Sequence, residues 1–183
     1  MAQSTMAQLS IDQIKRPDGV VVDRVYVNAE IAAPAAAVWA RVSDHEATPT
    51  WVKVAKKVTL TRDGKPRGGL NAIRVVQFKP LMWSTVTEEV TYFDPPHQFH
   101  YVVRKGTPGL RDHLGKVIVE ELGGGRSRLR WEVDFMFKQF HPLHFMVPRI
   151  MRDFGAAIAD GVETLKQQME GSAGAAGAIR RAG

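Results

Sequence analysis

The sequence predicts an α+β fold, in which a seven-stranded, curved antiparallel sheet wraps around one long C-terminal helix and two short helices follow the first strand. Three observations support this prediction. Strand-like alternation dominates the middle of the chain, helical spacing is confined to two places, and short turns rich in Gly, Pro and Asp separate the strand segments. Strands joined by short turns pair antiparallel, and a large twisted sheet must bury one face.

The first predicted strand is VVVDRVYVNAEIAA, which alternates, is rich in β-branched residues and ends before Pro34. Pro34 then opens the first short helix, because proline is well tolerated in the first turn. Val38, Trp39 and Val42 follow at helical spacing. The segment HEATPTWV predicts a second short helix or a turn, whose length is limited by Pro49.

Six further strands are predicted between this region and the last helix. Each one combines β-branched or aromatic residues with a turn at its end. The turns include RDGKPRGG, Asp94–Pro95–Pro96 and Gly123–Gly124–Gly125. In chain order, the predicted strands are VAKKVTLT, LNAIRVVQF, MWSTVTEEVTYF, QFHYVVRK, HLGKVIVEEL and RLRWEVDFMF.

The last predicted element is a long amphipathic helix that begins near Pro148. Its apolar residues recur at steps of three and four, which is typical of a helix that buries one stripe. They are Ile150, Met151, Phe154, Ala157, Ile158, Gly161, Val162, Leu165 and Met169. A single helix cannot fill the concave side of a seven-stranded sheet, so the sequence also predicts a cavity between helix and sheet.

The chain of 183 residues, 44% hydrophobic and 24% charged, is predicted to form one domain. Residues 1–19 are expected to be a flexible extension, residues 20–170 the domain, and residues 171–183 a disordered tail rich in Gly and Ala. No apolar segment resembles a signal peptide or reaches transmembrane length. A cytoplasmic protein is therefore expected.

Composition also limits the chemistry. With no cysteine, the chain has no disulfide, thiol nucleophile or thiolate metal site. His141 and His144 are three residues apart but flank Pro142, so no metal site and no cofactor are expected. The net charge of +6 comes from scattered Lys and Arg without interleaved aromatic residues. Nucleic acid is accordingly not expected as a partner.

Four segments resemble a known family. They are EIAAPAAAVWARVSDHEATPTWV, GGLNAIRVV, EEVTYFDPPHQFHYVV and GGGRSRLRWEVDF, within Val20 to Met169. The sequence is similar to the START-like (SRPBCC) superfamily, and most similar to its bacterial polyketide cyclase/dehydrase-like group. This resemblance implies a helix-grip fold over residues 20–170, with a deep apolar cavity for a hydrophobic or polycyclic ligand. The superfamily includes lipid carriers, receptors and cyclases, so the fold does not determine the function.

Strand alternation predicts which side chains face that cavity. On the last strand, Leu129, Trp131, Val133, Phe135 and Phe137 share the apolar face. In the segment Arg111–Asp112–His113, the parity of the following strand turns His113 inward and Asp112 outward. On the strand MWSTVTEEVTYF, the inner set is Met82, Val86, Val90 and Tyr92, with Glu88 among them.

The predicted inward position of Glu88 requires a partner, because an unpaired buried carboxylate costs several kcal/mol. In the resembling family an arginine and a glutamate recur at positions matching Arg74 and Glu88, which implies an ion pair across neighbouring strands. The candidate catalytic residues are His113, Glu88, Arg74 and Tyr101. Each also has a purely structural interpretation. Glu88 and Arg74 can be an ion pair that fixes the strand register, His113 can be a rim histidine bonded to a backbone carbonyl, and Tyr101 can be part of the cavity wall.

The predicted ligand-binding residues combine the inner faces of the strands with the apolar stripe of the last helix and one tryptophan before the second predicted strand. They are Trp51, Arg74, Phe78, Val86, Glu88, Val90, Phe99, Tyr101, His113, Val117, Trp131, Val133, Phe135, Met146, Ile150, Met151, Phe154 and Ile158.

Three functions are compatible with these residues. The first is a carrier or sensor that binds a hydrophobic small molecule such as a lipid, polyketide or isoprenoid. The second is a polyketide cyclase/dehydratase-type enzyme that uses a general base and an oxyanion donor in the cavity. The third is a quinone- or lipid-handling module with transient membrane contact, which would need Arg62, Lys65, Arg67, Arg104, Lys105 and Arg111 to cluster at the cavity mouth. The oligomeric state is left open.

Overall fold

A computed structural model describes residues 6–79, 85–138, 142 and 144–181, with side chains described as far as residue 171. Its strands are β1 Gln8–Lys15, β2 Val21–Ile31, β3 Ala55–Arg62, β4 Ile73–Phe78, β5 Thr85–Asp94, β6 Gln98–Lys105, β7 Leu110–Gly123 and β8 Arg126–Phe137. The helical elements are α1 Ala35–Val42, η1 His45–Thr50, η2 His144–Met146 and α2 Val147–Arg181.

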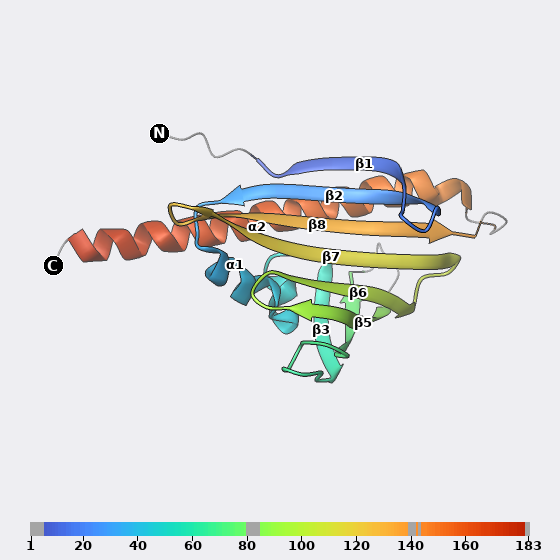
Figure 1. Ribbon diagram of the computed structural model, residues 1–183, viewed down its shortest axis with the longest axis horizontal. Helices are drawn as coiled ribbons and strands as arrows, with labels where there is room; N and C mark the ends of the chain where they lie inside the picture. Colours follow the sequence, from blue (N-terminus) through green and yellow to red (C-terminus); the bar gives the residue numbers. More distant parts are fainter. Residues whose placement is uncertain (1–5, 80–84, 139–141, 143, 182–183) are drawn as a thin grey trace.

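The strands form one antiparallel sheet in the order β1-β2-β8-β7-β6-β5-β4-β3. From β3 to β8 each strand pairs with its neighbour in the chain, as short turns require. Strand β2 pairs antiparallel with β8, so the first and last of the predicted strands are neighbours in the sheet. The long helix α2 runs along one face of the sheet (Figure 1). The predicted helix-grip fold is confirmed.

The described strands number eight instead of seven, because residues 8–15, expected within a flexible extension, form the edge strand β1. The polar residues of QLSIDQIK conceal this strand in the sequence. Its register with β2 places Leu9 opposite Val27 and Ile11 opposite Val25. Both side chains reach α2 at Gly155, where the absence of a side chain allows a close approach.

The C-terminal prediction also differs from the structure, since α2 continues to Arg181 where a disordered tail was expected from residue 171. The segment GSAGAAGAIRR contains several alanines, which have the highest helix propensity. Extending an existing helix avoids the unfavourable nucleation step that an isolated segment faces. The packed part of α2 therefore provides the nucleus for the rest.

The core lies between the sheet and the helices. Val27, Leu129 and Val133 of the sheet and Val162 and Leu165 of α2 are completely buried. At the other end of the sheet, α1 packs through Trp39, whose ring centroid lies 5.5 Å from that of Phe93 and 6.1 Å from that of Phe99. Helices α1 and α2 thus cover different parts of the same face.

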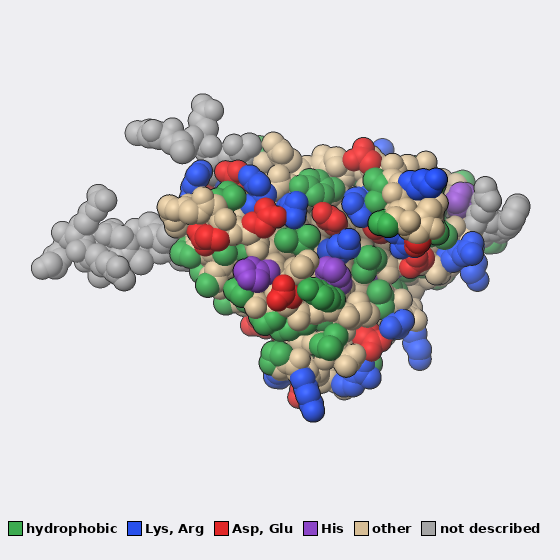
Figure 2. Space-filling view, viewed as in Figure 1, with side chains coloured by type: hydrophobic (Ala, Val, Ile, Leu, Met, Phe, Trp, Pro, Cys, Tyr) green, Lys and Arg blue, Asp and Glu red, His purple; other side chains and the backbone are tan. Residues whose placement is uncertain are grey.

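The opposite face of the sheet carries acidic and basic side chains intermingled (Figure 2). Asp134 is buried there because Arg24 on the neighbouring strand covers it, with Nε 2.6 Å from Oδ1. Asp112 also points outward, as predicted, and Arg16 Nη2 lies 2.7 Å from its Oδ2. Both pairs place opposite charges next to each other on this face.

Alternation fails at one point on β5. The prediction that Tyr92 faces inward is wrong, because the register between β5 and β6 shifts between Val90 and Tyr92. Tyr92 is instead 43% exposed, and its ring stacks on His100 at 4.7 Å. The next residue, Phe93, takes the inward place against Trp39. Met82, also predicted to face inward, lies outside the described residues.

Gly115 on β7 permits a close contact on which the cavity wall depends. It pairs with Tyr101 on β6, and a Cβ atom at Gly115 would lie 2.2 Å from Cζ of that ring. The ring therefore lies across β7, where its hydroxyl oxygen accepts a hydrogen bond from Nε1 of Trp131 on β8 at 2.9 Å. No larger residue leaves room for this arrangement.

We expect Gly115→Ala to displace the Tyr101 ring and to lower the free energy of unfolding by about 2 kcal/mol, as overpacking of a core does. Urea unfolding followed by tryptophan fluorescence measures the change. Gly171→Ala is the control, because a Cβ there meets nothing within 4 Å. Equal stability of wild type and Gly115→Ala would contradict the proposed contact.

Candidate ligand cavity

Two adjacent cavities lie between the sheet and α2, and they share a wall formed by Phe78 of β4, Glu88 of β5 and Phe154 of α2. Counted with the space at their openings, they measure about 520 Å³ and about 490 Å³. The first is also lined by Val86, Val103, Thr107, Leu110, His113, Phe135, Phe137 and Ile150. The second is also lined by Thr48, Val52, Val54, Ala55, Val58, Arg74, Val76, Tyr101, Trp131, Ala157 and Ile158.

The predicted ion pair in this wall is present. Arg74 and Glu88 are opposite each other in the β4–β5 register, and Arg74 Nε donates to Glu88 Oε2 at 2.7 Å. Both side chains are buried. A buried arginine remains charged, so the carboxylate compensates a charge that would otherwise be strongly destabilising.

A second partner of Arg74 is His45, a residue that was not among the predicted site residues. Its Nδ1 lies 2.7 Å from Arg74 Nη1 and its Nε2 lies 2.8 Å from the carbonyl oxygen of Gly68. Since a carbonyl only accepts and a guanidinium only donates, Nε2 carries the proton and Nδ1 accepts from Arg74. Burial, and then the positive charge of Arg74, lower the pKa of His45 to about 3.

The position of His45 depends on two distant pieces of chain. The side chain of Asp44 caps η1 by accepting from the backbone N–H of Ala47, which starts the turn at His45. The loop before β4 then brings the carbonyl of Gly68 to the ring. Gly68 has a φ of +79°, and a Cβ there would lie 3.3 Å from His45 Cδ2. Because this contact joins residues of separate turns, no local pattern reveals it.

Tyr101 completes the surroundings of Arg74. The Cζ atom of Arg74 lies 4.5 Å from the centroid of the Tyr101 ring, a cation–π distance. Burial, followed by the charge of Glu88, raises the pKa of Tyr101 well above its usual range. The hydroxyl therefore keeps its proton at neutral pH and can serve as a hydrogen-bond donor, but not as a base.

His113 points into the first cavity, which confirms the predicted orientation. Its ring lies edge-on to Phe135 with centroids 5.2 Å apart. Burial, and then the charge of Arg74, lower its pKa to about 4, so the imidazole is neutral at pH 7. Its Nδ1 is buried and has no hydrogen-bond partner among the described residues. A neutral, unpartnered nitrogen in a cavity can bind a polar group of a ligand or accept a proton.

The three residues of Arg111–Asp112–His113 therefore have three different environments. His113 faces the cavity, Asp112 is bound to Arg16 on the outer face, and Arg111 is exposed near the cavity mouth. They do not form a catalytic triad.

Most predicted ligand-binding residues line one of the two cavities: Arg74, Phe78, Val86, Glu88, Tyr101, His113, Trp131, Phe135, Ile150, Phe154 and Ile158. Six others are buried in the core without lining either cavity: Trp51, Val90, Phe99, Val117, Val133 and Met151. The reason is that alternation assigns a face of the sheet but not a position along it, and α1 with η1 fills one end. Met146 is 38% exposed on η2 and lines neither cavity.

Several lining residues were not among the predicted ligand-binding residues. Phe137 was correctly placed on the inner face of β8 but was not counted as a ligand contact, and alternation along β4 also indicates Val76. In contrast, Thr48 lies in the short helix η1, and Val52, Val54 and Thr107 lie in connecting segments, where no periodicity indicates the direction of a side chain.

The basic residues whose clustering at the cavity mouth would support membrane contact divide into two groups. Arg104, Lys105 and Arg111 line a recess at the mouth of the first cavity. The other three, Arg62, Lys65 and Arg67, are exposed and do not line this recess. Arg62 binds Glu89 at 2.6 Å, a carboxylate that it shares with Arg104, and Arg67 binds Glu46 at 2.8 Å.

No three His, Asp or Glu side chains among the described residues come together in a way that could hold a metal ion. His141, considered above, lies outside the described residues. No helix within the described part of the chain is long and apolar enough to cross a membrane.

The family assignment rests on a match over residues 23–170 with the family described as "Polyketide cyclase / dehydrase and lipid transport". The chain belongs to this family. The match includes every residue that lines either cavity, since all of them fall within 23–170. No curated protein matches the chain.

Solved structures show the same fold at low sequence identity. A START superfamily protein from Mycobacterium smegmatis is 20% identical, with a TM-score of 0.64 over 79% of this chain and 97% of that one. The Zhui aromatase/cyclase from Streptomyces sp. R1128 is 16% identical, with a TM-score of 0.64 over 80% and 95%. Norcoclaurine synthase from Thalictrum flavum is 19% identical, with a TM-score of 0.61 over 79% and 86%.

We expect Glu88→Gln to lower the free energy of unfolding by about 3 kcal/mol, because it leaves the buried Arg74 without a counter-charge. The neighbouring Glu89→Gln is the matched control. Glu89 pairs with Arg62 and Arg104 on the outer face, so its loss should change the stability by about 1 kcal/mol at most. Urea unfolding of both variants measures the difference. A similar decrease in the free energy of unfolding in both would contradict the larger contribution expected from the buried pair.

The two buried histidines predict acid sensitivity. Both pKa values, about 3 for His45 and about 4 for His113, lie below the ordinary value of 6.5. Below pH 6.5 these histidines bind protons in the unfolded chain but not in the folded chain. Their contribution to the free energy of unfolding is therefore fully present above pH 6.5 and is lost as the pH falls towards their folded-state pKa values. Each histidine should contribute a slope of about 1.4 kcal/mol per pH unit at most.

Urea unfolding between pH 7.5 and pH 5 measures this slope, and His113→Gln should reduce it. The same substitution at His97, which is exposed, should leave the slope unchanged. An identical pH dependence in wild type and His113→Gln would rule out the neutral, buried state of His113.

Proposed function

We propose that this protein binds a hydrophobic small molecule in the two-part cavity between the sheet and α2, as a carrier or sensor. The observation that supports this function is the distribution of polarity in the cavity. Its walls are apolar except for a few groups, and the charges of Arg74 and Glu88 compensate each other at 2.7 Å. An apolar ligand can therefore occupy the cavity without burying an unpaired charge.

A second candidate is an enzyme of the cyclase type, and His113 is the observation that favours it. Closure of a ring by aldol addition begins when a base removes a proton from the carbon next to a carbonyl. The neutral His113 imidazole, with an unpartnered Nδ1, has the required form at pH 7. The Tyr101 hydroxyl could donate to the enolate oxygen. The similarity of the fold to an aromatase/cyclase is compatible with this chemistry.

The binding proposal is tested with Nile red, a neutral dye that fluoresces in apolar surroundings. Phe154 contributes to both cavities, so Phe154→Trp should narrow their junction and weaken dye binding about tenfold. The matched control is Phe145→Trp, because Phe145 is 79% exposed on η2. Fluorescence titration of folded variants, checked by circular dichroism, measures the affinities. Equal affinities for Phe154→Trp and wild type would place the dye elsewhere.

Native mass spectrometry separates the two candidates. A retained hydrophobic molecule that is recovered unaltered supports a carrier or sensor. A ligand recovered together with its own cyclised or dehydrated form supports an enzyme, and His113→Gln should then abolish the product while the ligand remains bound.

A further inference from the structure

A polar recess of about 300 Å³ adjoins the mouth of the first cavity at the turn between β6 and β7. It is lined by Val103, Arg104, Lys105, Gly106, Thr107, Leu110, Arg111, Asp112 and His113. Four of these residues, Val103, Thr107, Leu110 and His113, also line the first cavity. The apolar cavity and the polar recess are therefore adjacent parts of one site.

The recess carries an excess of positive charge. Its three cationic residues, Arg104, Lys105 and Arg111, are exposed at the surface. The one carboxylate in its lining belongs to Asp112, and Arg16 Nη2 already binds it at 2.7 Å. Within the described part of the chain, no acidic side chain forms an ion pair with Lys105 or Arg111 at 4.0 Å or less.

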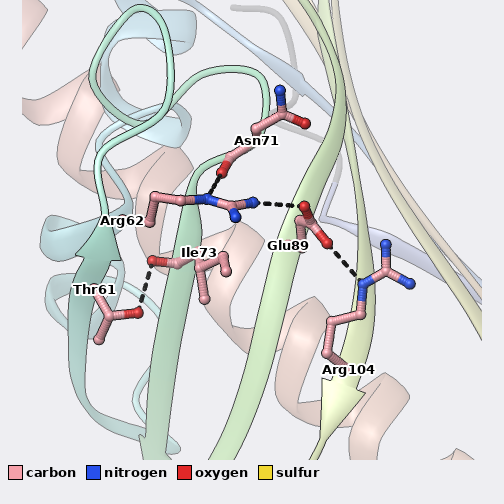
Figure 3. A network of polar contacts seen from close by, with 6 residues as sticks. All are labelled: Thr61, Arg62, Asn71, Ile73, Glu89 and Arg104. Carbon is pink, nitrogen blue, oxygen red and sulfur yellow. Dashed lines mark hydrogen bonds and ion pairs between the residues drawn. The ribbon is translucent and has the colours of Figure 1, made fainter.

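Arg104 is held in place by the outer face of the sheet. Its Nε donates to Glu89 Oε2 at 2.8 Å, and Arg62 binds the other oxygen of the same carboxylate. Figure 3 shows the two terminal nitrogens of Arg104 pointing away from Glu89. Glu89 thus orients the guanidinium and leaves part of it available to another anion.

His113 supplies a second, independent indication of a ligand at this junction. It lines both the cavity and the recess, and its buried Nδ1 has no partner among the described residues. A buried polar atom without a partner is costly, and a polar group of a ligand would satisfy it.

From these observations we propose that the ligand is an amphiphile with an anionic head, either a carboxylate or a phosphate, and an apolar tail. The tail occupies the first cavity, and the head binds at Lys105, Arg111 and Arg104 in the recess. This inference rests on the proposed binding function and specifies its ligand class. Since the recess is open to water, the head keeps part of its hydration and its desolvation penalty stays small.

The test compares two ligands of equal chain length, decanoate and 1-decanol, by their ability to displace Nile red. Wild type should bind decanoate about tenfold more tightly, which corresponds to about 1.4 kcal/mol. In the double variant Lys105→Gln/Arg111→Gln this preference should fall to about twofold, because exposed charge pairs contribute modestly but additively. Affinity for 1-decanol should stay the same.

The matched control is Lys56→Gln/Lys57→Gln, which removes the same charge from exposed positions on β3. It should keep the tenfold preference. An equal loss in the control would show a general attraction by net charge and would overturn the recess as the site. Decyl phosphate is measured beside decanoate. If it binds more tightly than decanoate, the preferred head is a phosphate; if it binds more weakly, the preferred head is a carboxylate.

Two failures are distinguishable. If Nile red and 1-decanol bind but decanoate shows no preference, the cavity binds hydrophobic molecules and only the anionic head is refuted. If neither Nile red nor either ligand binds, the proposed function itself fails, and this inference fails with it.

Discussion

The buried charge of Arg74 constrains the rest of the site. A guanidinium away from water is tolerated only when its charge and its N–H groups are matched. Glu88 supplies the charge, His45 accepts a hydrogen bond, and the Tyr101 ring presents its face. These partners come from β5, η1 and β6, while Arg74 itself belongs to β4. One charge therefore fixes the relative positions of four elements around the cavity.

The same compensation explains why the cavity is apolar although charged residues line it. Arg74 and Glu88 neutralise each other, His45 is neutral, and Tyr101 keeps its proton. Among the described residues that line the two cavities and the recess, the cations without an acidic partner, Lys105 and Arg111, lie in the recess at the mouth, where water can solvate them. The cavity exists because one helix meets a large curved sheet, while α1 and η1 fill only one end of that sheet.

Features that depend on local periodicity could be predicted from the sequence, and features that depend on distant contacts could not. Alternation revealed seven strands and the inward His113, and family resemblance together with the cost of a buried carboxylate led to the Arg74–Glu88 pair. Strand β1 was missed because its polar residues dilute the pattern, and Tyr92 was misplaced because a bulge shifts the register. His45 was missed because its partners, Arg74 and Gly68, meet it only in the folded chain.

The position of His113 separates the two candidate functions physically. It stands where the apolar cavity meets the cationic recess. If an anionic head occupies the recess, a base at His113 can reach only the part of the ligand next to that head. In an enzyme built on this site, the reaction would take place next to that head. The Tyr101 ring centroid lies 5.5 Å from that of His113, but Tyr101 lines the second cavity, so the reacting carbonyl would have to lie where the two cavities meet. A carrier has no such restriction, because its ligand needs only an apolar tail and a matching charge.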